Sequence, residues 1–379
     1  MEELKPVCFS EHLSFNAYSD QGKNIETNFL LPPLQTAEGI DTAVAAIKHY
    51  QKQVGLPFAF ELGANYLKPG KHEMPDGYFV NQIAEKADCC ILLDMHNLWT
   101  NQQNGRQSIA EFIDQLDVYR ISEIHVAAGF HHRNYYIDAH SGISSGEFME
   151  MVETVVMKLP ALKAIIFEII PEYLNNLEDA DLRHQLEQMH RIWAKRGSEH
   201  KQSPAATLVS VEEGEFSVRE WEQTLGGLAI GHKVPETALS SLLSHDNGLS
   251  ILKELIFHAR ASLLVSSLKL TIRLLRLNLG EDSFNRYLLG FFSKTSPSLF
   301  PISVAMKFIG YLSANHPEIR YLDCISQFEL ASIKTAADNK VRVIHFDFDP
   351  MVVIDALNNF ELPPSDSRKI DFSLQIGPG

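Results

Sequence analysis

The feature that most constrains the fold is a series of five short apolar runs in the first half of the chain, each ending in a carboxylate or an imidazole. At the spacing expected for the strands of a β/α barrel, the runs occupy residues 7–12, 57–61, 90–96, 121–125 and 164–168. The polar groups at these ends, with a pair that follows the fourth run, are His12, Glu61, Asp94, His96, His125, Asp138, His140 and Glu168. Because such groups are costly to bury singly, their repetition at strand ends predicts a shared site for a polyvalent metal.

Between these runs the sequence has the periodicity of amphipathic helices. Residues 36–54 begin with the capping residue Thr36 and have apolar side chains at Ile40, Val44 and Ile47. The same periodicity predicts further helices at 76–86, 108–116, 146–158 and 179–195, which alternate with predicted strands at 57–60, 89–94, 121–127 and 164–170. This alternation predicts a parallel sheet covered by helices, with the carboxyl ends of its strands at one shared edge.

The length of 379 residues favours two domains. Residues 197–220 are rich in Gly, Ser, Pro and Glu, and we expect them to link a metal-binding domain of residues 1–196 to a second domain of residues 221–379. Residues 221–277 and 299–337 have helical spacing, and residues 341–349 alternate with period two. The second domain is therefore predicted to be a mostly helical α+β domain. The fold class is therefore α/β and barrel-like, followed by this helical region.

Net charge and cysteine content exclude some functions. The formal net charge of −15 disfavours nucleic-acid binding, because phosphate contacts need clustered Lys and Arg. The four cysteines lack the spacing of a zinc site, and we expect them to be reduced thiols of a cytoplasmic protein. We expect neither a signal peptide nor a membrane span, and hence no membrane partner.

Two of the polar pairs share a spacing that favours one metal-binding face. Asp94 and His96, like Asp138 and His140, are two residues apart, which on an extended strand places both side chains on the same side. A set of His, Asp and Glu without thiolate suits iron, manganese or zinc. A set larger than four suits two or three ions better than one tetrahedral zinc.

Each of these residues also has a structural interpretation. His125 after an apolar strand is also typical of a hydrogen-bonded core histidine. Glu61 and Glu168 are compatible with buried ion pairs, and Asp138 and His140 with capping of a loop. The pattern alone leaves both interpretations open.

Six ordered motifs surround these residues: Ser10-Glu-His12-Leu-Ser14, Phe58-Ala-Phe-Glu61, Leu92-Leu-Asp94-Met-His-Asn97-Leu, Glu123-Ile-His125-Val-Ala-Ala-Gly129, Ile137-Asp138-Ala-His140-Ser-Gly142 and Phe167-Glu168. Together they resemble the multinuclear non-haem iron-dependent oxidase family over about residues 7–174. The resemblance implies a TIM-barrel enzyme that modifies cysteine residues of ribosomally made peptides. It implies as iron ligands His12, Glu61, Asp94, His125, Asp138, His140 and Glu168, with His96 and Asn97 as further ligands or their neighbours.

The resemblance also implies cofactors and partners. These are two or three non-haem iron ions (Fe2+/Fe3+), O2 as co-substrate and a cysteine-containing precursor peptide. Residues 321–332 resemble helices of the partner proteins that present peptides to these oxidases, so we expect residues 221–379 to recruit the substrate. Arg106, in the loop after Asp94, is a candidate to hold a peptide carboxylate.

One departure from the family pattern keeps alternatives open. Family members have about three further strands before the Ser-Glu-His motif, whereas eleven residues precede His12 here. We therefore expect a partial TIM barrel that is continued upstream, completed by a partner protein or a second copy, or retained as a non-enzymatic scaffold. A further alternative is a hydrolase or isomerase of the xylose-isomerase-like kind with zinc or manganese, which metal identity and O2 consumption distinguish.

Overall fold

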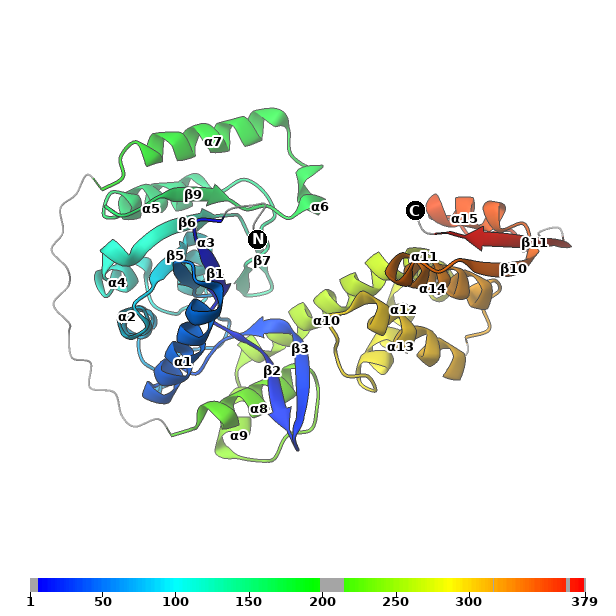
Figure 1. Cartoon of the computed structure of the whole chain (residues 1–379), viewed down its shortest axis with the longest axis horizontal. Helices are drawn as coiled ribbons and strands as arrows, with labels where there is room; N and C mark the ends of the chain where they lie inside the picture. Colours follow the sequence, from blue (N-terminus) through cyan, green and yellow to red (C-terminus); the bar gives the residue numbers. More distant parts are fainter. Residues whose placement is uncertain (1–5, 198–214, 316, 366–368, 378–379) are drawn as a thin grey trace. The chain divides into compact units, whose positions relative to one another are not determined.

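The structure is a computed structural model that describes residues 6–197, 215–315, 317–365 and 369–377. The chain forms two compact units that its path visits alternately. Unit 1 comprises Met1–Phe15, Leu30–Gly226 and Val234–Ile251; unit 2 comprises Asn16–Phe29, Gly227–Lys233 and Leu252–Gly379 (Figure 1).

Unit 1 contains a parallel sheet whose strand order follows the order of the chain. Its strands, in the order β1-β4-β5-β6-β9, are β1 (Phe9–His12), β4 (Phe58–Glu61), β5 (Cys90–Asp94), β6 (Ile121–Val126) and β9 (Ala164–Phe167). In register, His12 pairs with Glu61 and Asp94 pairs with His125. The carboxyl ends of β1 and β4, and those of β5 and β6, therefore lie near the same level at one edge of the sheet, as in a β/α barrel, and the predicted fold class of this region is confirmed.

Helices connect these strands and cover the sheet (Figure 1). They are α1 (Ala37–Val54), α2 (Asp76–Ala87), α4 (Ile109–Asp114), α5 (Gly146–Val156) and α7 (Asp179–Trp193), each within two residues of its predicted bounds. The Thr36 side chain caps α1 by accepting from Gly39 N, and Ser108 begins α4 with a capping box. Side chains such as Phe79 and Phe112 are almost fully buried in the core, each contributing about 1.5–3 kcal/mol.

Several short elements were not predicted. Helix α3 (Met95–Gln103) follows β5 without a loop, and 3-10 helix η1 (Val118–Arg120) precedes β6. Helix α6 (Pro171–Leu174) follows β9. Two hairpins add strands outside the main sheet: β2 (Phe15–Asp20) with β3 (Lys23–Leu31), and β7 (Phe130–His132) with β8 (Tyr135–Ile137).

The last part of unit 1 comes from beyond residue 214. Helix α8 (Val218–Ala229) lies there up to Gly226, α9 (Ala238–Ser244) lies there entirely, and α10 (Asn247–Ser267) begins there. Trp221 Nε1 donates to the carbonyl oxygen of Pro32 at 2.9 Å, and Lys68 N donates to Asp246 Oδ2 at 2.8 Å. These contacts explain why this segment groups with the sheet. The predicted boundary at residues 197–220 stays a prediction, since residues 198–214 lie outside the described residues and the units divide the chain along other lines.

Unit 2 is mostly helical with one antiparallel hairpin, as expected for the α+β region. Its elements are α11 (Lys269–Leu279), α12 (Glu281–Phe292), α13 (Pro301–Ala314), α14 (Leu322–Asp338), β10 (Arg342–Phe348), α15 (Pro350–Asn358) and β11 (Lys369–Ile376). The buried carboxylate of Glu329 on α14 accepts the backbone N–H groups of Leu270 and Thr271 at 2.7 and 2.8 Å, which fixes α14 against the start of α11. Unit 2 thus has a hydrophobic core of its own.

Within the described residues, no single helix has the length and hydropathy to cross a membrane. Helices α10 and α11 meet those criteria only as a pair, and the pair is bent by 114° at its break.

Candidate metal centre

The strand ends of unit 1 bring most of the predicted ligands together. We call this set the ligand cluster: Glu61, Asp94, His96, His125, Asp138, His140 and Glu168. Within it, three groups of three residues place candidate ligand atoms within 4.8 Å of one another. The groups are Glu61/Asp94/His125, Asp94/His140/Glu168 and His96/Asp138/His140.

Asp94 lies at the centre of the ligand cluster, at the junction of β5 and α3. Its Oδ1 caps α3 by accepting from Asn97 N at 2.8 Å. Asn97 Nδ2 in turn donates to Glu61 Oε1 at 2.8 Å. Asn97 therefore fixes the orientation of Glu61, while Asp94 Oδ2 has no hydrogen-bond partner in the part of the chain that the structure describes.

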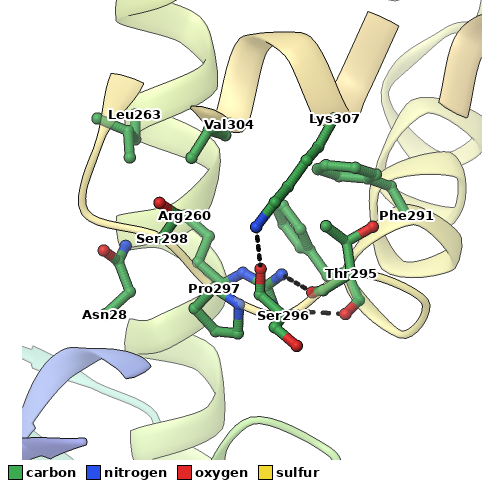
Figure 2. A pocket seen from close by; sticks show the side chains of 11 residues that line it. Asn28, Arg260, Leu263, Phe291, Thr295, Ser296, Pro297, Ser298, Val304 and Lys307 are labelled. Atoms are coloured by element: carbon green, nitrogen blue, oxygen red, sulfur yellow. Dashed lines mark hydrogen bonds between the residues drawn. The ribbon is translucent and has the colours of Figure 1, made fainter. Parts of the chain in front are cut away.

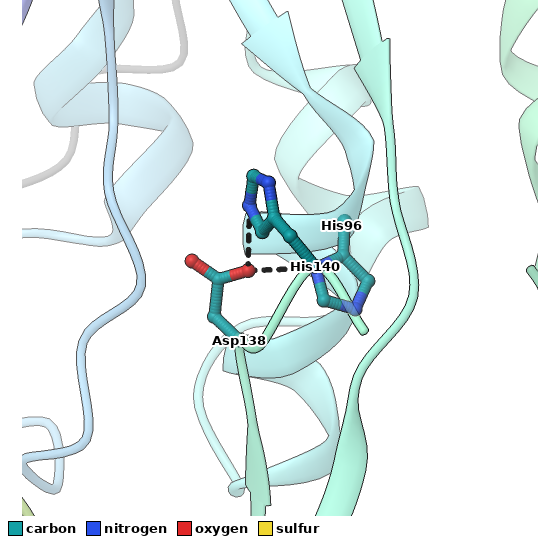
Figure 3. A group of neighbouring side chains, drawn as sticks. All are labelled: His96, Asp138 and His140. Atoms are coloured by element: carbon teal, nitrogen blue, oxygen red, sulfur yellow. Dashed lines mark hydrogen bonds and ion pairs between the residues drawn. The ribbon is translucent and has the colours of Figure 1, made fainter. Parts of the chain in front are cut away.

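The His96, Asp138 and His140 side chains meet at one carboxylate oxygen (Figure 3). Asp138 Oδ1 lies 2.8 Å from His96 Nδ1 and 3.1 Å from His140 Nε2. The expected reason for this proximity was wrong, because neither pair lies on an extended strand. His96 is in the first turn of α3, and Asp138 and His140 follow the β7–β8 hairpin, with His140 at a φ of 46°.

Gly129 permits this arrangement, because an added Cβ there would lie 2.1 Å from the carbonyl oxygen of Ile137 and 3.0 Å from His96 Nε2. The hairpin that carries Asp138 therefore approaches the His96 ring only where no side chain intervenes.

Glu168, just beyond β9, joins two histidines. Its Oε1 lies 3.1 Å from His125 Nδ1, and its Oε2 lies 3.4 Å from His140 Nδ1. The other ring nitrogen of His125, Nε2, lies 3.0 Å from Glu123 Oε1. His125 is thus held between two carboxylates.

His12 lies at the margin of the ligand cluster. Its Nε2 is 3.6 Å from Glu61 Oε2, its side chain is 45% exposed, and it belongs to none of the three groups. The structure places it beside the cluster without completing a group.

Burial and crowding favour the protonated forms of two carboxyls in the ligand cluster, Glu61 and Asp94. Burial, and then the charge of Asp94, raise the pKa of Glu61 to about 8. Burial, and then the charge of Asp138, also raise the pKa of Asp94 above its usual value. Within the described part of the chain, the ion pairs of these carboxylates are all to histidine. The cluster therefore has more carboxyl groups than its histidines can compensate by carrying a positive charge.

The pKa values of two histidines are also raised, which favours their charged form. Burial opposes their charged form, yet hydrogen bonds to Glu168 and Glu123 raise the pKa of His125 to about 9. His140 is likewise opposed by burial, and its hydrogen bond to Asp138 raises its pKa to about 9. A hydrogen bond from His125 lowers the pKa of Glu168. Protons thus occupy positions that a cation would otherwise fill.

Three buried atoms show that the donor set fits a metal. Asp94 Oδ2, His96 Nε2 and Asn97 Oδ1 have no hydrogen-bond partner among the described residues. Each unpaired buried polar atom costs about 1–3 kcal/mol. Carboxylate oxygens and imidazole nitrogens suit iron, manganese or zinc, and a bound cation would satisfy these atoms.

Arg106 lies apart from the ligand cluster in a buried ion-pair network. Its guanidinium donates to Asp76 Oδ1 at 2.6 Å, to Gln35 Oε1 at 3.1 Å and to the carbonyl oxygen of Leu67 at 2.9 Å. Glu73 Oε2 lies 3.8 Å away. We call Arg106, Asp76, Glu73 and Gln35 the Arg106 network. Because the Arg106 side chain is 2% exposed and its guanidinium is bound to these partners, the structure argues against the expected contact with a substrate carboxylate.

Two contributors to the site were not predicted. Glu123 holds His125, and Tyr66 Oη accepts the backbone N–H of Asp138 at 3.1 Å. The i, i+2 spacing of Glu123 and His125 on a strand was an available signal. Tyr66 had none, because it lies 72 residues from Asp138 in the sequence.

Unit 2 has a pocket of a different kind (Figure 2). Its buried Arg260 donates to the carbonyl oxygens of Thr295 and Phe292 at 2.6 and 3.4 Å, and Lys307 Nζ donates to the carbonyl oxygen of Ser296 at 3.3 Å. The interior volume of about 10 Å³ holds little more than one water. These cations therefore serve the local backbone.

Parallel strands that end in a buried set of His, Asp and Glu side chains define a β/α protein with a candidate multi-ligand metal centre. The chain belongs to the family described as RiPP precursor modification enzyme MbnB/TglH/ChrH, which matches residues 1–191. RiPP denotes a ribosomally synthesised and post-translationally modified peptide. The family predicted from the sequence motifs is confirmed.

Curated relatives match the same half of the chain. A UPF0276 protein of Psychromonas ingrahamii is 26% identical over 187 residues, 46% of this chain and 63% of the relative. UPF0276 proteins of Neisseria meningitidis serogroup B and Acinetobacter baylyi are 30% and 34% identical, over 44% and 37% of this chain and 59% and 47% of each relative. The chain thus spans less than two thirds of the length of each.

Among solved structures, the IolI protein crystallised with a zinc atom overlaps 52% of this chain and 78% of its own. The TM-score of 0.27 and the 14% identity make this similarity too weak to carry an argument.

Proposed function

We propose that this protein is an iron- and O2-dependent oxidase that modifies cysteine residues of a ribosomally synthesised peptide. The observation that carries the proposal is the ligand cluster: three overlapping groups of His, Asp and Glu, with unpaired buried atoms, at the strand ends of a chain from a RiPP-modifying family.

The overlap between the groups supports more than one ion. Asp94 belongs to two groups and His140 to two, so ions held by the three groups would be neighbours. Glu61 and His125 complete the first group, Glu168 the second, and His96 with Asp138 the third. Two or three irons would thus share the central ligands, with His12 and Asn97 as contributors at the margin.

The iron would supply one-electron chemistry with O2, and the protein's part is positioning and control of protons. The N-cap of α3 fixes Asp94, Asn97 fixes Glu61, and Tyr66 fixes Asp138. The His96 ring packs at right angles to Phe148, with ring centroids 5.9 Å apart. Both side chains are almost fully buried, so the His96 side of the cluster is closed to solvent.

The exposed side of the cluster indicates where a substrate would enter. The His12 side chain is 45% exposed and the Glu168 side chain 33%, whereas His96 is 1% exposed. A peptide thiol would therefore approach past His12 and Glu168. We carry forward the hypothesis that the region after residue 221, including α14, recruits the peptide.

The test combines metal analysis with O2 consumption. The full chain is loaded anaerobically with Fe(II), its metal content is measured, and O2 uptake is followed with a cysteine-containing peptide encoded beside its gene. We expect about two or three irons per chain and a mass change confined to cysteine. Asp94→Asn should abolish turnover, whereas the matched surface variant Asp179→Asn should not.

Other outcomes would contradict the proposal. Tight binding of zinc or manganese, with no O2 uptake in any metal form, would favour the hydrolase or isomerase alternative. Substoichiometric metal of every kind would favour a non-enzymatic scaffold.

A further inference from the structure

We propose that Glu123 is a positioning residue that presents Nδ1 of His125 to the metal. The inference rests on the proposed metal centre and goes beyond it, because Glu123 belongs to none of the three candidate ligand groups.

The alternation of β6 brings the two side chains together. Glu123 and His125 are two residues apart on this strand, so both point to the same face of the sheet. His125 Nε2 lies 3.0 Å from Glu123 Oε1. The carboxylate accepts a hydrogen bond from this nitrogen, which requires that Nε2 carry a proton.

The remaining nitrogen faces the candidate ligands. His125 Nδ1 is buried and lies 3.1 Å from Oε1 of Glu168, a member of the ligand cluster. Without metal, Nδ1 donates its own proton toward this Glu168 oxygen. A metal that replaces that proton binds the lone pair of Nδ1 on the side where Glu168 lies, while Glu123 keeps the proton at Nε2. The tautomer that Glu123 selects is therefore the one that binds a metal through Nδ1.

The chemistry of the pair predicts its effect. A carboxylate on the distal N–H of a ligating histidine fixes the ring orientation and increases the basicity of the ligand nitrogen. Loss of such a partner typically costs 10–100-fold in metal affinity. An amide in place of the carboxylate still accepts the hydrogen bond but removes the charge.

The test compares Glu123→Ala, Glu123→Gln and the control Glu187→Gln, an exposed residue on α7. The full chain is titrated anaerobically with Co(II), whose visible absorption bands report ligand geometry, and separately with Fe(II). We expect the alanine variant to lose 10–100-fold in affinity and to alter the Co(II) bands. The glutamine variant should fall between wild type and alanine, and the control should match wild type.

The outcomes separate this inference from the proposed function. Wild-type affinity and unchanged Co(II) bands in Glu123→Ala would overturn the role of Glu123 alone. Absence of metal binding by the wild-type chain would overturn the proposed function and this role with it. Equal losses in the alanine and glutamine variants, with unchanged Co(II) bands at saturation, would assign Glu123 to general stability and also overturn the proposal.

Discussion

Unit 1 holds two buried polar clusters that differ in one respect. In the Arg106 network a guanidinium faces the carboxylates, and among the described residues no buried nitrogen or oxygen of the network lacks a hydrogen-bond partner. In the ligand cluster, the basic side chains paired with the carboxylates are all histidines among the described residues, where Asp94 Oδ2 and His96 Nε2 have no hydrogen-bond partner. The first cluster carries its own cation, and the second has the composition of a site that takes a cation from solution.

The largest expected effect on the free energy of unfolding comes from disrupting the Arg106 network. Arg106→Ala leaves Asp76 and Glu73 buried without their cation, and removing one partner of a buried pair costs about 3–5 kcal/mol. All three tryptophans lie in unit 1 (Trp99, Trp193 and Trp221), so their fluorescence during urea unfolding reports on this unit.

The exposed Arg183→Ala serves as the control, with an expected loss below about 0.5 kcal/mol. Adding Asp76→Asn and Glu73→Gln to Arg106→Ala should recover part of the loss, because the stranded charges are then gone. A loss below about 1 kcal/mol for Arg106→Ala would show that Asp76 and Glu73 do not depend on the Arg106 guanidinium to balance their charge.

A substitution in the ligand cluster should lower metal affinity and leave the free energy of unfolding of the metal-free protein unreduced. Asp94→Asn keeps the oxygen that caps α3 but removes a shared ligand. We expect metal affinity to fall more than about 100-fold, because the effect of a ligand exceeds that of its hydrogen-bond partners. The metal-free protein should be as stable as wild type or more so, since a crowded carboxyl is neutralised.

Fluorescence-monitored urea unfolding and metal titration measure the two quantities on the same samples. A marked loss of stability in metal-free Asp94→Asn would contradict the distinction between the two clusters.

The pH dependence of the metal-free protein is a third test. Glu61, with its pKa raised to about 8, and His125 and His140, with theirs raised to about 9, bind more protons folded than unfolded. Their stabilising contribution is therefore present at low pH and lost as pH rises, most steeply from about 6.5 to 8, by up to about 1.4 kcal/mol per group per pH unit.

Metal binding should cancel this decrease of the free energy of unfolding with pH. It should also release protons near pH 7, because the ligands must be deprotonated. Urea unfolding at pH 6.5, 7.5 and 8.5, with and without metal, measures both slopes. Metal-free stability that rises over this range would refute the assigned protonation.

The smallest expected effect is that of Tyr66→Phe. The change removes the hydroxyl that accepts Asp138 N–H, at a cost of about 1 kcal/mol, and it should weaken metal binding by less than tenfold. The exposed Tyr119→Phe is the matched control. If Tyr66→Phe reduced metal affinity as much as Asp94→Asn, Tyr66 would have to be counted with the ligands.

The sequence predicted the sheet of unit 1 well, because strands buried on both faces are continuous apolar runs. It also predicted which side chains gather, because the carboxyl ends of parallel strands share an edge. It failed on local geometry at His96: an Asp that ends a strand also caps a helix, and the short string Asp94-Met-His96 does not distinguish the two conformations.

Other features depended on distant parts of the sequence. Arg106 was expected at the site, but its partners Asp76 and Gln35 lie 30 and 71 residues away, and no local pattern indicates them. The strands of the β7–β8 hairpin have three residues each, too few to show a period.

The discontinuous path of unit 1 has a consequence for how the protein folds as it is made. The last strand of the sheet ends at Phe167, but the hydrogen-bond partners of Pro32 and Lys68 are Trp221 and Asp246, which come later in the sequence. Closing contacts over 189 and 178 residues is slow compared with local pairing. On the ribosome, the sheet would therefore emerge together with the ligand cluster well before the segments that complete the unit around it.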